Sequence, residues 1–204
     1  MAVELNTENQ KFSYGLGQSV GNNFMNEGFK EAFEVEAFVG GITDAFAGSN
    51  AMNVDEINQI IQKKVGELKA GAHKEAKADG EKFLEENKSK EGVTVLESGL
   101  QYEVIEAGDD SGAKPQLTSQ VTTHYTGMLI DGKVFDSSVQ RGEPASFPVN
   151  GVIPGWTEAL QLMVPGDKWK LFIPFELAYG ERGAGADIPP FAALIFDIEL
   201  ISVD

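Results

Sequence analysis

The feature that most constrains the fold is a change of hydrophobic period near residue 90. Before it, apolar residues recur every three or four positions and no proline occurs, as in amphipathic helices. After it, apolar and polar residues alternate, and all 8 prolines occur, most of them between residues 144 and 190. A chain of 204 residues is long enough for both kinds of region. The pattern predicts a helical region and then a sheet region, with the boundary near Ser89–Gly92.

Three helices are expected in the first region. Two apolar stripes mark the first two, and a glycine suited to a C-cap follows the second. The stripes are Phe12, Leu16, Val20 and Phe24, then Val35, Phe38, Val39, Ile42 and Phe46 before Gly48. Asn53 with Glu56 resembles a capping box, which predicts a third helix from Val54 to Lys88. At ~1.5 Å per residue it would be ~50 Å long, and its second half, poor in large apolar residues, is expected to stand largely in solvent.

The first two helices carry more aromatic residues than a small helical unit can bury. With half of the third helix they amount to only ~65 residues, too few for a satisfactory core. Pairing with a second copy through residues 1–50 would cover this surface, so a homodimer is expected. A closed monomeric core of three helices is the alternative.

The second region predicts an α+β domain of antiparallel strands with one short helix. Alternation marks strands at Leu100–Val104, Val121–Tyr125, Lys168–Ile173 and Leu194–Leu200. Asp131-Gly132 between apolar pairs indicates a hairpin, and only Thr157–Leu162 looks helical. The expected domains are a helical dimerisation domain (1–52), a long connecting helix (53–90) and a sheet domain (91–204).

Composition argues against several classes of partner and site. The net charge of −16 disfavours nucleic acids and anionic membrane surfaces as partners. There is no cysteine, and His73 and His124 have no spaced partner, so no metal site is expected. No apolar run approaches the ~20 residues that span a bilayer. Because no signal peptide is visible, we expect a cytoplasmic location, or a periplasmic one if a signal peptide had been removed.

Five short motifs in the second region carry aromatic and aliphatic residues with few charges. They are Tyr125-Thr126-Gly127, the run from Asp131 to Ser138, Val152-Ile153-Pro154-Gly155-Trp156, Leu177-Ala178-Tyr179-Gly180 and Ile188-Pro189-Pro190. No nucleophile–base pair accompanies them, so a pocket made from them suits an apolar ring better than acid–base chemistry. In order and spacing they resemble the FKBP-type peptidyl-prolyl cis–trans isomerases, the macrolide-binding immunophilins. The first region resembles the Mip-like bacterial subgroup, which has a helical dimerisation module, a long helix and then the FKBP domain.

This resemblance implies an antiparallel sheet wrapped around the short helix, with a pocket between them. It implies these catalytic residues: Tyr125, Phe135, Asp136, Ile153, Trp156, Tyr179 and Phe196. It also implies these substrate-binding residues: Phe147, Val152, Ile188 and Ala184. No metal or other cofactor is implied.

Three positions depart from the family's pattern. Ala184 stands where many members have a histidine, and Ala145 where many eukaryotic members have an aromatic residue. Asp187 stands where an aliphatic residue is common. The first two open the rim of the expected pocket and the third adds a charge, which bears on the affinity for macrolide inhibitors, a ligand class that the resemblance implies.

The expected function is a peptidyl-prolyl cis–trans isomerase that acts as a folding catalyst on proline-containing peptides and unfolded chains. Amide rotation needs no proton transfer, only preferential binding of the twisted amide in an apolar aromatic pocket. The alternative is a chaperone-like module that binds such chains, with turnover incidental. A proline-limited refolding assay with a short-peptide control separates the two.

Overall fold

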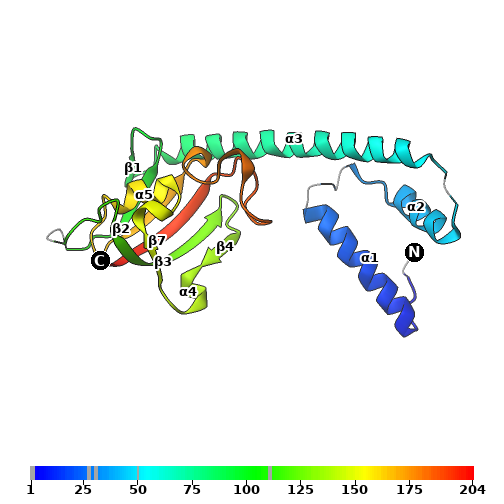
Figure 1. Cartoon of the computed structure of the whole chain (residues 1–204), viewed down its shortest axis with the longest axis horizontal. Helices are drawn as coiled ribbons and strands as arrows, with labels where there is room; N and C mark the ends of the chain where they lie inside the picture. Colours follow the sequence, from blue (N-terminus) through cyan, green and yellow to red (C-terminus); the bar gives the residue numbers. More distant parts are fainter. Residues whose placement is uncertain (1–2, 27–28, 30–31, 50, 110–111) are drawn as a thin grey trace. The chain divides into compact units, whose positions relative to one another are not determined.

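The chain forms two compact units, Met1–Ala72 and His73–Asp204, in the computed structural model (Figure 1). The structure describes residues 3–26, 29, 32–49, 51–109 and 112–204. Helix α3 (Val54–Asn87) contributes to both units, because the division falls within it. The domain limits expected at residues 52 and 90 stay predictions. Within the described ranges, no helix is long and apolar enough to cross a membrane.

The first unit contains α1 (Glu8–Asn26), α2 (Val35–Ala47) and the first part of α3. Helix α2 ends where the sequence predicts, at Gly48, which has a φ of 68°. The N–H groups of Gly48 and Ser49 donate to carbonyls in the last turn, which completes this C-cap. At the start of α3, Asn53 Oδ1 accepts from the N–H of Asp55 at 2.8 Å. The Asn53 cap therefore bonds to the second residue of the helix.

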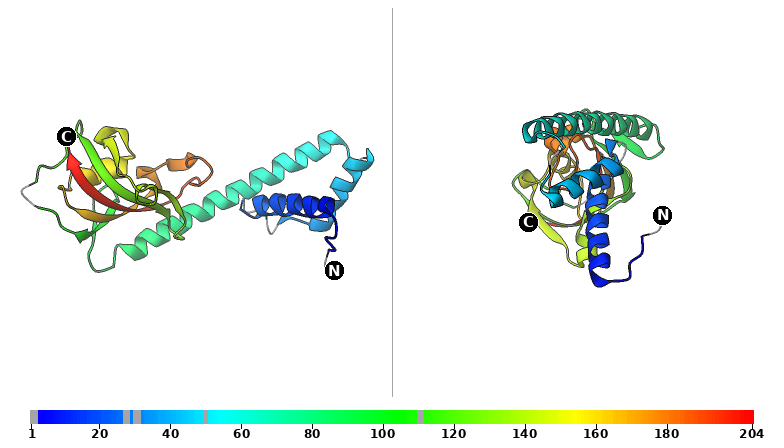
Figure 2. Two further views of the ribbon diagram at one scale, coloured as in Figure 1. Left: turned by 90° about the horizontal axis from the view of Figure 1, so that it is seen from below. Right: turned by 90° about the vertical axis from the view of Figure 1, so that its right-hand side faces the viewer.

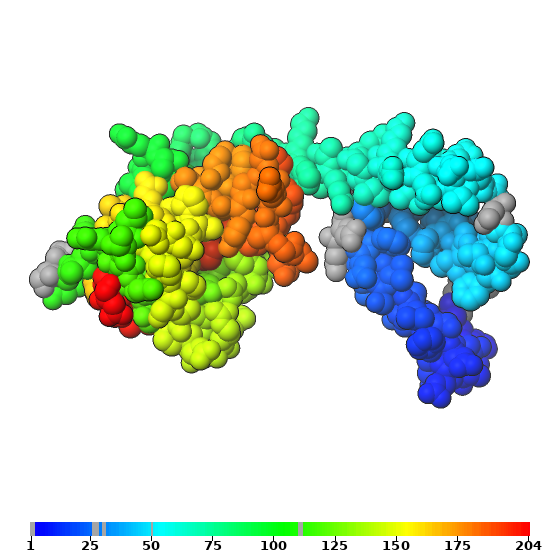
Figure 3. All heavy atoms as spheres, viewed as in Figure 1, coloured from blue at the N-terminus to red at the C-terminus, as the bar shows by residue number. Residues whose placement is uncertain are grey.

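The first unit has no buried side chain among the residues that the structure describes. Its densest packing is a phenylalanine cluster, in which Phe33 lies 4.9 Å from both Phe24 and Phe38, ring centroid to ring centroid. Phe12 is 64% exposed and Phe46 is 92% exposed. In Figure 3 the atoms of α1, in dark blue, extend away from those of α2 over much of the helix. A closed three-helix core is therefore absent from the described part of this unit.

The second unit is built on one antiparallel sheet of seven strands, in the order β1-β2-β6-β7-β3-β4, with β5 paired to β3. The strands are β1 (Val93–Val95), β2 (Gln101–Glu106), β3 (Gln120–Leu129), β4 (Val134–Ser137), β5 (Ala145–Pro148), β6 (Lys168–Ile173) and β7 (Leu194–Val203). The predicted hairpin joins β3 to β4, and the N–H of Gly132 donates to the carbonyl of Leu129. The expected α+β class is confirmed.

Short helices connect the strands: α4 (Ser138–Arg141), η2 (Val149–Gly151), α5 (Pro154–Leu160), η3 (Phe175–Leu177) and η4 (Gly180–Arg182). Helix α5 begins three residues before the predicted Thr157, because Pro154 suits the first turn of a helix. The prediction of a single helix was wrong, since α4 also forms. Ser137 Oγ accepts from the N–H of Gln140 and caps this very short helix.

Helix α5 lies inside the curve of the sheet (Figures 1 and 2). Its buried residues Trp156, Ala159 and Leu160 belong to the same core as Leu171 of β6 and Leu194 of β7. At about 25 cal/mol per Å² of apolar surface removed from water, this core is the main stabilising feature of the unit. The buried face of α5 therefore faces the sheet, and a pocket lies between the two.

The second half of α3 packs on this unit and does not stand free in solvent, which corrects the expectation of a solvated rod. Asn87 is fully buried, and its Nδ2 donates to Gln101 Oε1 at 2.9 Å. Gly80 is also buried, and a Cβ there would lie 3.1 Å from the Cβ of Ala193. Phe83 also packs on Phe172 of β6, with ring centroids 6.0 Å apart, but the buried positions of the contact are small or polar and do not stand out in the apolar pattern.

Candidate active site

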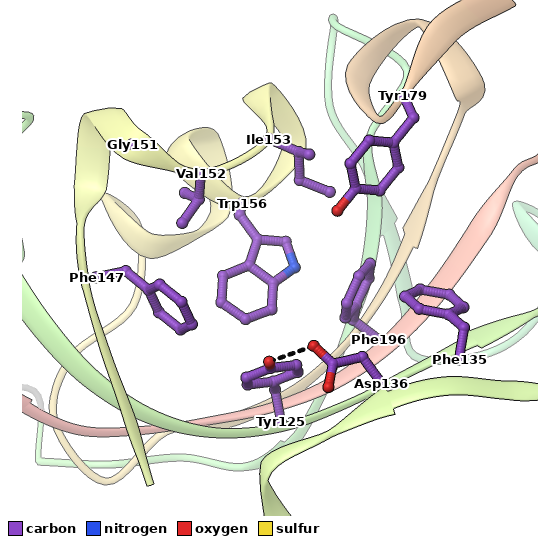
Figure 4. Close-up of a pocket in the computed structure, with 10 residues that line it drawn as sticks. All are labelled: Tyr125, Phe135, Asp136, Phe147, Gly151, Val152, Ile153, Trp156, Tyr179 and Phe196. Atoms are coloured by element: carbon purple, nitrogen blue, oxygen red, sulfur yellow. Dashed lines mark hydrogen bonds between the residues drawn. The ribbon is translucent and has the colours of Figure 1, made fainter. Parts of the chain in front are cut away.

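A pocket of about 440 Å³ opens between α5 and the sheet (Figure 4). Strands β3, β4, β5 and β7 supply its aromatic side chains, together with α5 and the loop after β6, which carries Tyr179. The lining residues are Tyr125, Phe135, Asp136, Phe147, Gly151, Val152, Ile153, Trp156, Tyr179 and Phe196. Ring faces and aliphatic groups therefore dominate its surface.

Trp156 occupies the centre of this aromatic wall and is only 4% exposed. Three rings stand nearly perpendicular to the indole. Their centroids lie 5.2 Å away for Tyr125, 5.2 Å for Phe196 and 5.8 Å for Phe147. Edge-to-face packing of this kind is favourable and holds each ring in one orientation. The base of the pocket is therefore a fixed, flat apolar surface.

Gly127 on β3 permits the close approach of Phe196 and Phe135. A Cβ at this position would lie 2.6 Å from Phe196 and 2.7 Å from Phe135, which is too close for either ring to stay in place. The two rings instead meet edge to face over the strand, with centroids 5.5 Å apart. The absence of a side chain at Gly127 thus shapes the pocket.

The polar group of the pocket is a network of Tyr125, Asp136 and Arg141. The hydroxyl of Tyr125 donates to Asp136 Oδ2 at 2.5 Å. Arg141 Nη1 pairs with Asp136 Oδ1, and Arg141 Nη2 donates to the Tyr125 hydroxyl oxygen at 2.9 Å. Charge-assisted bonds of this kind are the stronger class of hydrogen bond. They fix both the ring of Tyr125 and the carboxylate of Asp136.

This network keeps Asp136 ionised and Tyr125 protonated. Burial acts to raise the pKa of Asp136, but the hydrogen bonds from Tyr125 and Arg141 outweigh it and hold the pKa below its ordinary value. Burial, reinforced by the bond to Asp136, raises the pKa of Tyr125. Neither group is therefore set to exchange a proton near neutral pH, which agrees with a reaction that needs no proton transfer.

Two donors stand at the rim. The hydroxyl of Tyr179 points toward the pocket (Figure 4), and the residue is 39% exposed. Burial and then the negative charge of Asp136 raise the pKa of Tyr179, so its hydroxyl keeps its proton. Ile153 is the N-cap of α5, and its own N–H makes no backbone hydrogen bond to a described residue. Both groups could donate to carbonyls of a bound chain.

The structure brings together nine of the residues that the sequence singled out, and it places two elsewhere. Ala184 and Ile188 pair with each other through two backbone hydrogen bonds, of 2.9 and 3.1 Å, in the loop after Tyr179. Ile188 joins the hydrophobic core, and neither residue lines the pocket. Their contact with substrate stays a prediction.

Sequence reasoning missed two residues of the site, Gly151 and Arg141. Gly151 lies where a Cβ would be 2.7 Å from the ring of Pro148, so the turn leaves no room for a side chain. Arg141 ends the unpredicted helix α4. Its one sequence signal is that it is the only basic residue between Lys133 and Lys168.

Acidic and histidine residues do not gather into a metal site in the part of the chain that the structure describes. His124 Nδ1 lies 3.1 Å from Ser138 Oγ, and the residue does not line the pocket. The chemistry of the pocket is therefore that of an aromatic binding site with a few fixed hydrogen-bonding groups.

Two family models match the chain. One, described as "FKBP-type peptidyl-prolyl cis-trans isomerase", covers residues 111–201. The other, described as the "domain amino terminal to FKBP-type peptidyl-prolyl isomerase", covers residues 9–104. The two matches together span both units.

Individual relatives match over nearly their whole length. The "FKBP-type 22 kDa peptidyl-prolyl cis-trans isomerase" of Escherichia coli is 53% identical over 195 residues, which is 94% of this chain and 93% of the relative. The "Outer membrane protein MIP" of Legionella longbeachae is 45% identical over 210 residues, covering 99% and 88%. The crystal structure of FkpA from Escherichia coli matches with a TM-score of 0.71 at 38% identity, covering 98% of this chain and 99% of that one.

The expected cytoplasmic location finds no support in these relatives, one of which is named an outer membrane protein. The fold class and the enzyme class, in contrast, are confirmed. The identity over nearly complete chains and the two family matches show that the chain belongs to the FKBP-type peptidyl-prolyl cis–trans isomerases, in the group with a helical domain before the isomerase domain.

Proposed function

We propose that the prolyl ring of a substrate chain binds on Trp156 in this pocket and that the preceding amide bond rotates there. The observation that carries the proposal is the flat indole at the base, with Tyr125, Phe147 and Phe196 standing edge-on around it. A pyrrolidine ring is apolar and compact, and such a surface suits it. The proposed substrates are proline-containing peptides and unfolded protein chains.

The apolar surroundings also explain how the rate would rise. Rotation about the amide has a barrier of ~18–20 kcal/mol, because the planar form is stabilised by resonance. The twisted amide has lost this resonance and is less dipolar, so removal from water costs it less free energy than it costs the planar form. A pocket that binds the twisted form more tightly lowers the barrier, by about 1.4 kcal/mol for each tenfold in rate.

The rim donors would hold the chain on either side of the rotating bond. In this proposal the Tyr179 hydroxyl and the Ile153 N–H each donate to a substrate carbonyl. Asp136 lies beside the pocket as a fixed carboxylate, near the position of the twisted carbonyl carbon. Arg141 neutralises part of that charge and fixes its direction. Phe135, Val152 and Phe147 complete the walls.

The two tryptophans of the chain provide a test with a matched control. Trp169 is 7% exposed and stacks on Tyr102 with centroids 4.2 Å apart, away from the pocket lining. Both Trp156→Leu and Trp169→Leu remove a buried indole and should lower stability. Only Trp156→Leu should lower kcat/KM on a short proline peptide, by about tenfold or more, the equivalent of 1.4 kcal/mol of transition-state binding. Equal losses in the two folded variants would refute the assignment of the pocket.

We further propose that the first unit dimerises through residues 1–50 and contributes to holding client chains. The observation that favours this is the lack of any buried side chain among its described residues, with Phe46 92% exposed. Isolated helices gain most of their stability from packing, so this surface requires a cover. A second copy of the chain would provide it and would present two pockets to one client, which raises the effective concentration of the second contact.

A chaperone-like binding role is the second candidate function, and one comparison separates it from catalysis. If the first unit holds clients, charged substitutions on its apolar face should slow catalysis of a proline-limited refolding reaction. They should leave turnover of a short peptide unchanged. Equal effects on both substrates, or none on either, would remove the holding role and leave the isomerase pocket as the whole function.

Macrolide inhibitors are a further proposed class of ligand for the same pocket. Asp187, a departure from the family's pattern, does not stand as an isolated charge. Lys133 Nζ lies 3.0 Å from its Oδ1. Calorimetric titration with a macrolide would measure the affinity, and Trp156→Leu should lose binding in the same assay.

A further inference from the structure

The segment from residue 174 to residue 193, which carries Tyr179, packs on the second half of α3. In Figure 3 its orange atoms border the part of α3 that lies in the same unit. The ring centroids of His73 and Phe191 lie 5.8 Å apart, and Lys77 Nζ lies 5.5 Å from the centroid of Phe175. At Gly80 the helix backbone approaches Ala193 so closely that a Cβ would lie 3.1 Å from its Cβ. One face of α3 therefore supports the outside of this segment.

Phe191 has an unfavourable backbone conformation. Its φ is 62°, and it is the one residue other than glycine with a positive φ in the described part of the chain. Bulky residues avoid this region because of steric clash, so such a conformation persists only where the surroundings enforce it. Here the ring packs between two others: its centroid lies 5.2 Å from that of Phe175 as well as beside His73.

A backbone hydrogen bond connects Phe191 to the active site. The N–H of Phe191 donates to the carbonyl of Gly180 at 3.0 Å, and Gly180 directly follows Tyr179. If Phe191 relaxed to an ordinary negative φ, its N–H would turn and this bond would be lost. The carbonyl of Gly180, one residue after Tyr179, would then lose this hydrogen-bond partner.

The opposite side of the segment has a much weaker restraint. The ion pair of Lys133 with Asp187 connects it to the β3–β4 hairpin, but the two side chains are 54% and 62% exposed. Exposed pairs of this kind contribute little to order, since water screens them. The packing of Phe191 on α3 is therefore the stronger of these two restraints on the segment.

We infer that Phe191, held by His73 and Phe175 against α3, is a positioning residue that sets the place of the Tyr179 hydroxyl in the pocket. The inference rests on the proposed role of Tyr179 as a donor to substrate. It makes the second half of α3 a part of the active-site support. The helix thus has a role in turnover on short peptides that is separate from any role of the first unit.

The test measures kcat/KM on a short proline peptide with full-length variants. Phe191→Gly keeps the positive φ without strain and removes the ring, while Phe191→Leu keeps part of the apolar contact. Because misplacement of a binding group by ~1 Å can cost up to about a hundredfold in rate, we expect a loss of about tenfold or more for Phe191→Gly. Phe191→Leu should recover part of it. The positioning role predicts that kcat/KM falls while the proline ring still binds on Trp156 with unchanged affinity. Trp156 fluorescence measures that affinity.

A double-mutant cycle with Tyr179→Phe separates positioning from general destabilisation. If Phe191 acts through the hydroxyl, Phe191→Gly should cost less than about twofold once that hydroxyl is absent, because groups that act together are not additive. Additive losses would overturn the inference. Full activity of Tyr179→Phe alone would show that the hydroxyl is not a donor to substrate. That result would refute the proposed role of Tyr179, and the single variant is enough to reveal it.

Phe83→Ala is the matched control. Phe83 is another α3 aromatic, and its ring packs on Phe172 of β6, with centroids 6.0 Å apart. It should lower the free energy of unfolding and leave kcat/KM unchanged while the protein is folded. A loss of kcat/KM equal to that of Phe191→Gly would overturn the inference. If Phe191→Gly fails to fold, His73→Ala removes the helix side of the same contact, and unchanged activity in that variant would also overturn it.

Discussion

The two units differ in how far they bury their apolar side chains. The sheet unit buries Leu171, Leu194 and Leu200 to zero exposure around α5. The helical unit leaves Phe46 92% exposed and buries none of its described side chains. The difference teaches that regular secondary structure and a complete core are separate properties. The sheet unit has the burial that an independent domain needs, whereas the helical unit lacks it within one chain.

The largest expected effect comes from opening the core of the sheet unit. Leu171→Ala removes a side chain of 0% exposure and should lower the free energy of unfolding by about 2–5 kcal/mol. Leu16→Ala, at a position 53% exposed, should change it by about 0.5 kcal/mol or less in a chain diluted to the monomer. Urea denaturation followed by circular dichroism measures both. A large loss at Leu16 in dilute protein would break the comparison, since it would show a core in the helical unit.

The next effect sharpens the same comparison by testing what covers the helical unit. Ile42→Asp places a charge on the apolar face of α2, at a position 44% exposed. If this face is a dimer interface, association should weaken by about 2 kcal/mol or more. Light scattering on a sizing column should show the mass shift from dimer to monomer. Thr43→Asp adds the same charge at the edge of this face, one turn after Val39, and should weaken association less than Ile42→Asp. A full-length chain that is monomeric at all concentrations would contradict the prediction.

A smaller effect concerns acid. The folded pKa of Asp136 lies below its ordinary value of 3.8, so the ionised carboxylate stabilises the fold above that pH. This stability should be lost as the pH falls through the folded pKa. Because the Asp136 side chain is 43% exposed, the contribution should be about 1 kcal/mol or less.

Unfolding by urea at a series of pH values from neutral to below 3.8 measures this contribution. Asp136→Asn should flatten the acid limb of the stability curve. Asp197→Asn, which changes another exposed ion-paired carboxylate outside the pocket, is the control. An unchanged acid limb in Asp136→Asn would show that the network of Tyr125 and Arg141 does not stabilise the ionised form.

The smallest effect is expected at the exposed ion pair of the Tyr179 segment. Asp187→Asn breaks the contact with Lys133 and should change stability by about 0–1 kcal/mol, less still at high salt. Turnover should change by less than about twofold, since a weak restraint is removed. A large, salt-dependent loss of kcat/KM would show that this ion pair, and not the packing on α3, holds the segment.

Local patterns in the sequence determined the elements and most of the pocket. Gly48 and Asn53 mark helix ends because capping depends on residues within one turn. Alternation along β3 places Tyr125 on the inner face, since successive strand residues point to opposite sides. The family motifs then identified nine of the residues that line the pocket. Arg141 was missed because it belongs to a four-residue helix, which is too short to show a period.

Only the tertiary structure decided which distant residues meet. No local pattern pairs His73 with Phe191, which lie more than a hundred residues apart, or requires a positive φ at Phe191. Helix α3 approaches the sheet unit closely at Gly80, because glycine has no side chain to contact Ala193. The sequence by itself determined what each segment forms and which face is apolar, because those properties depend on near neighbours. Which faces come together depends on the packing of the whole unit. That packing places the second half of α3 against the segment that carries Tyr179.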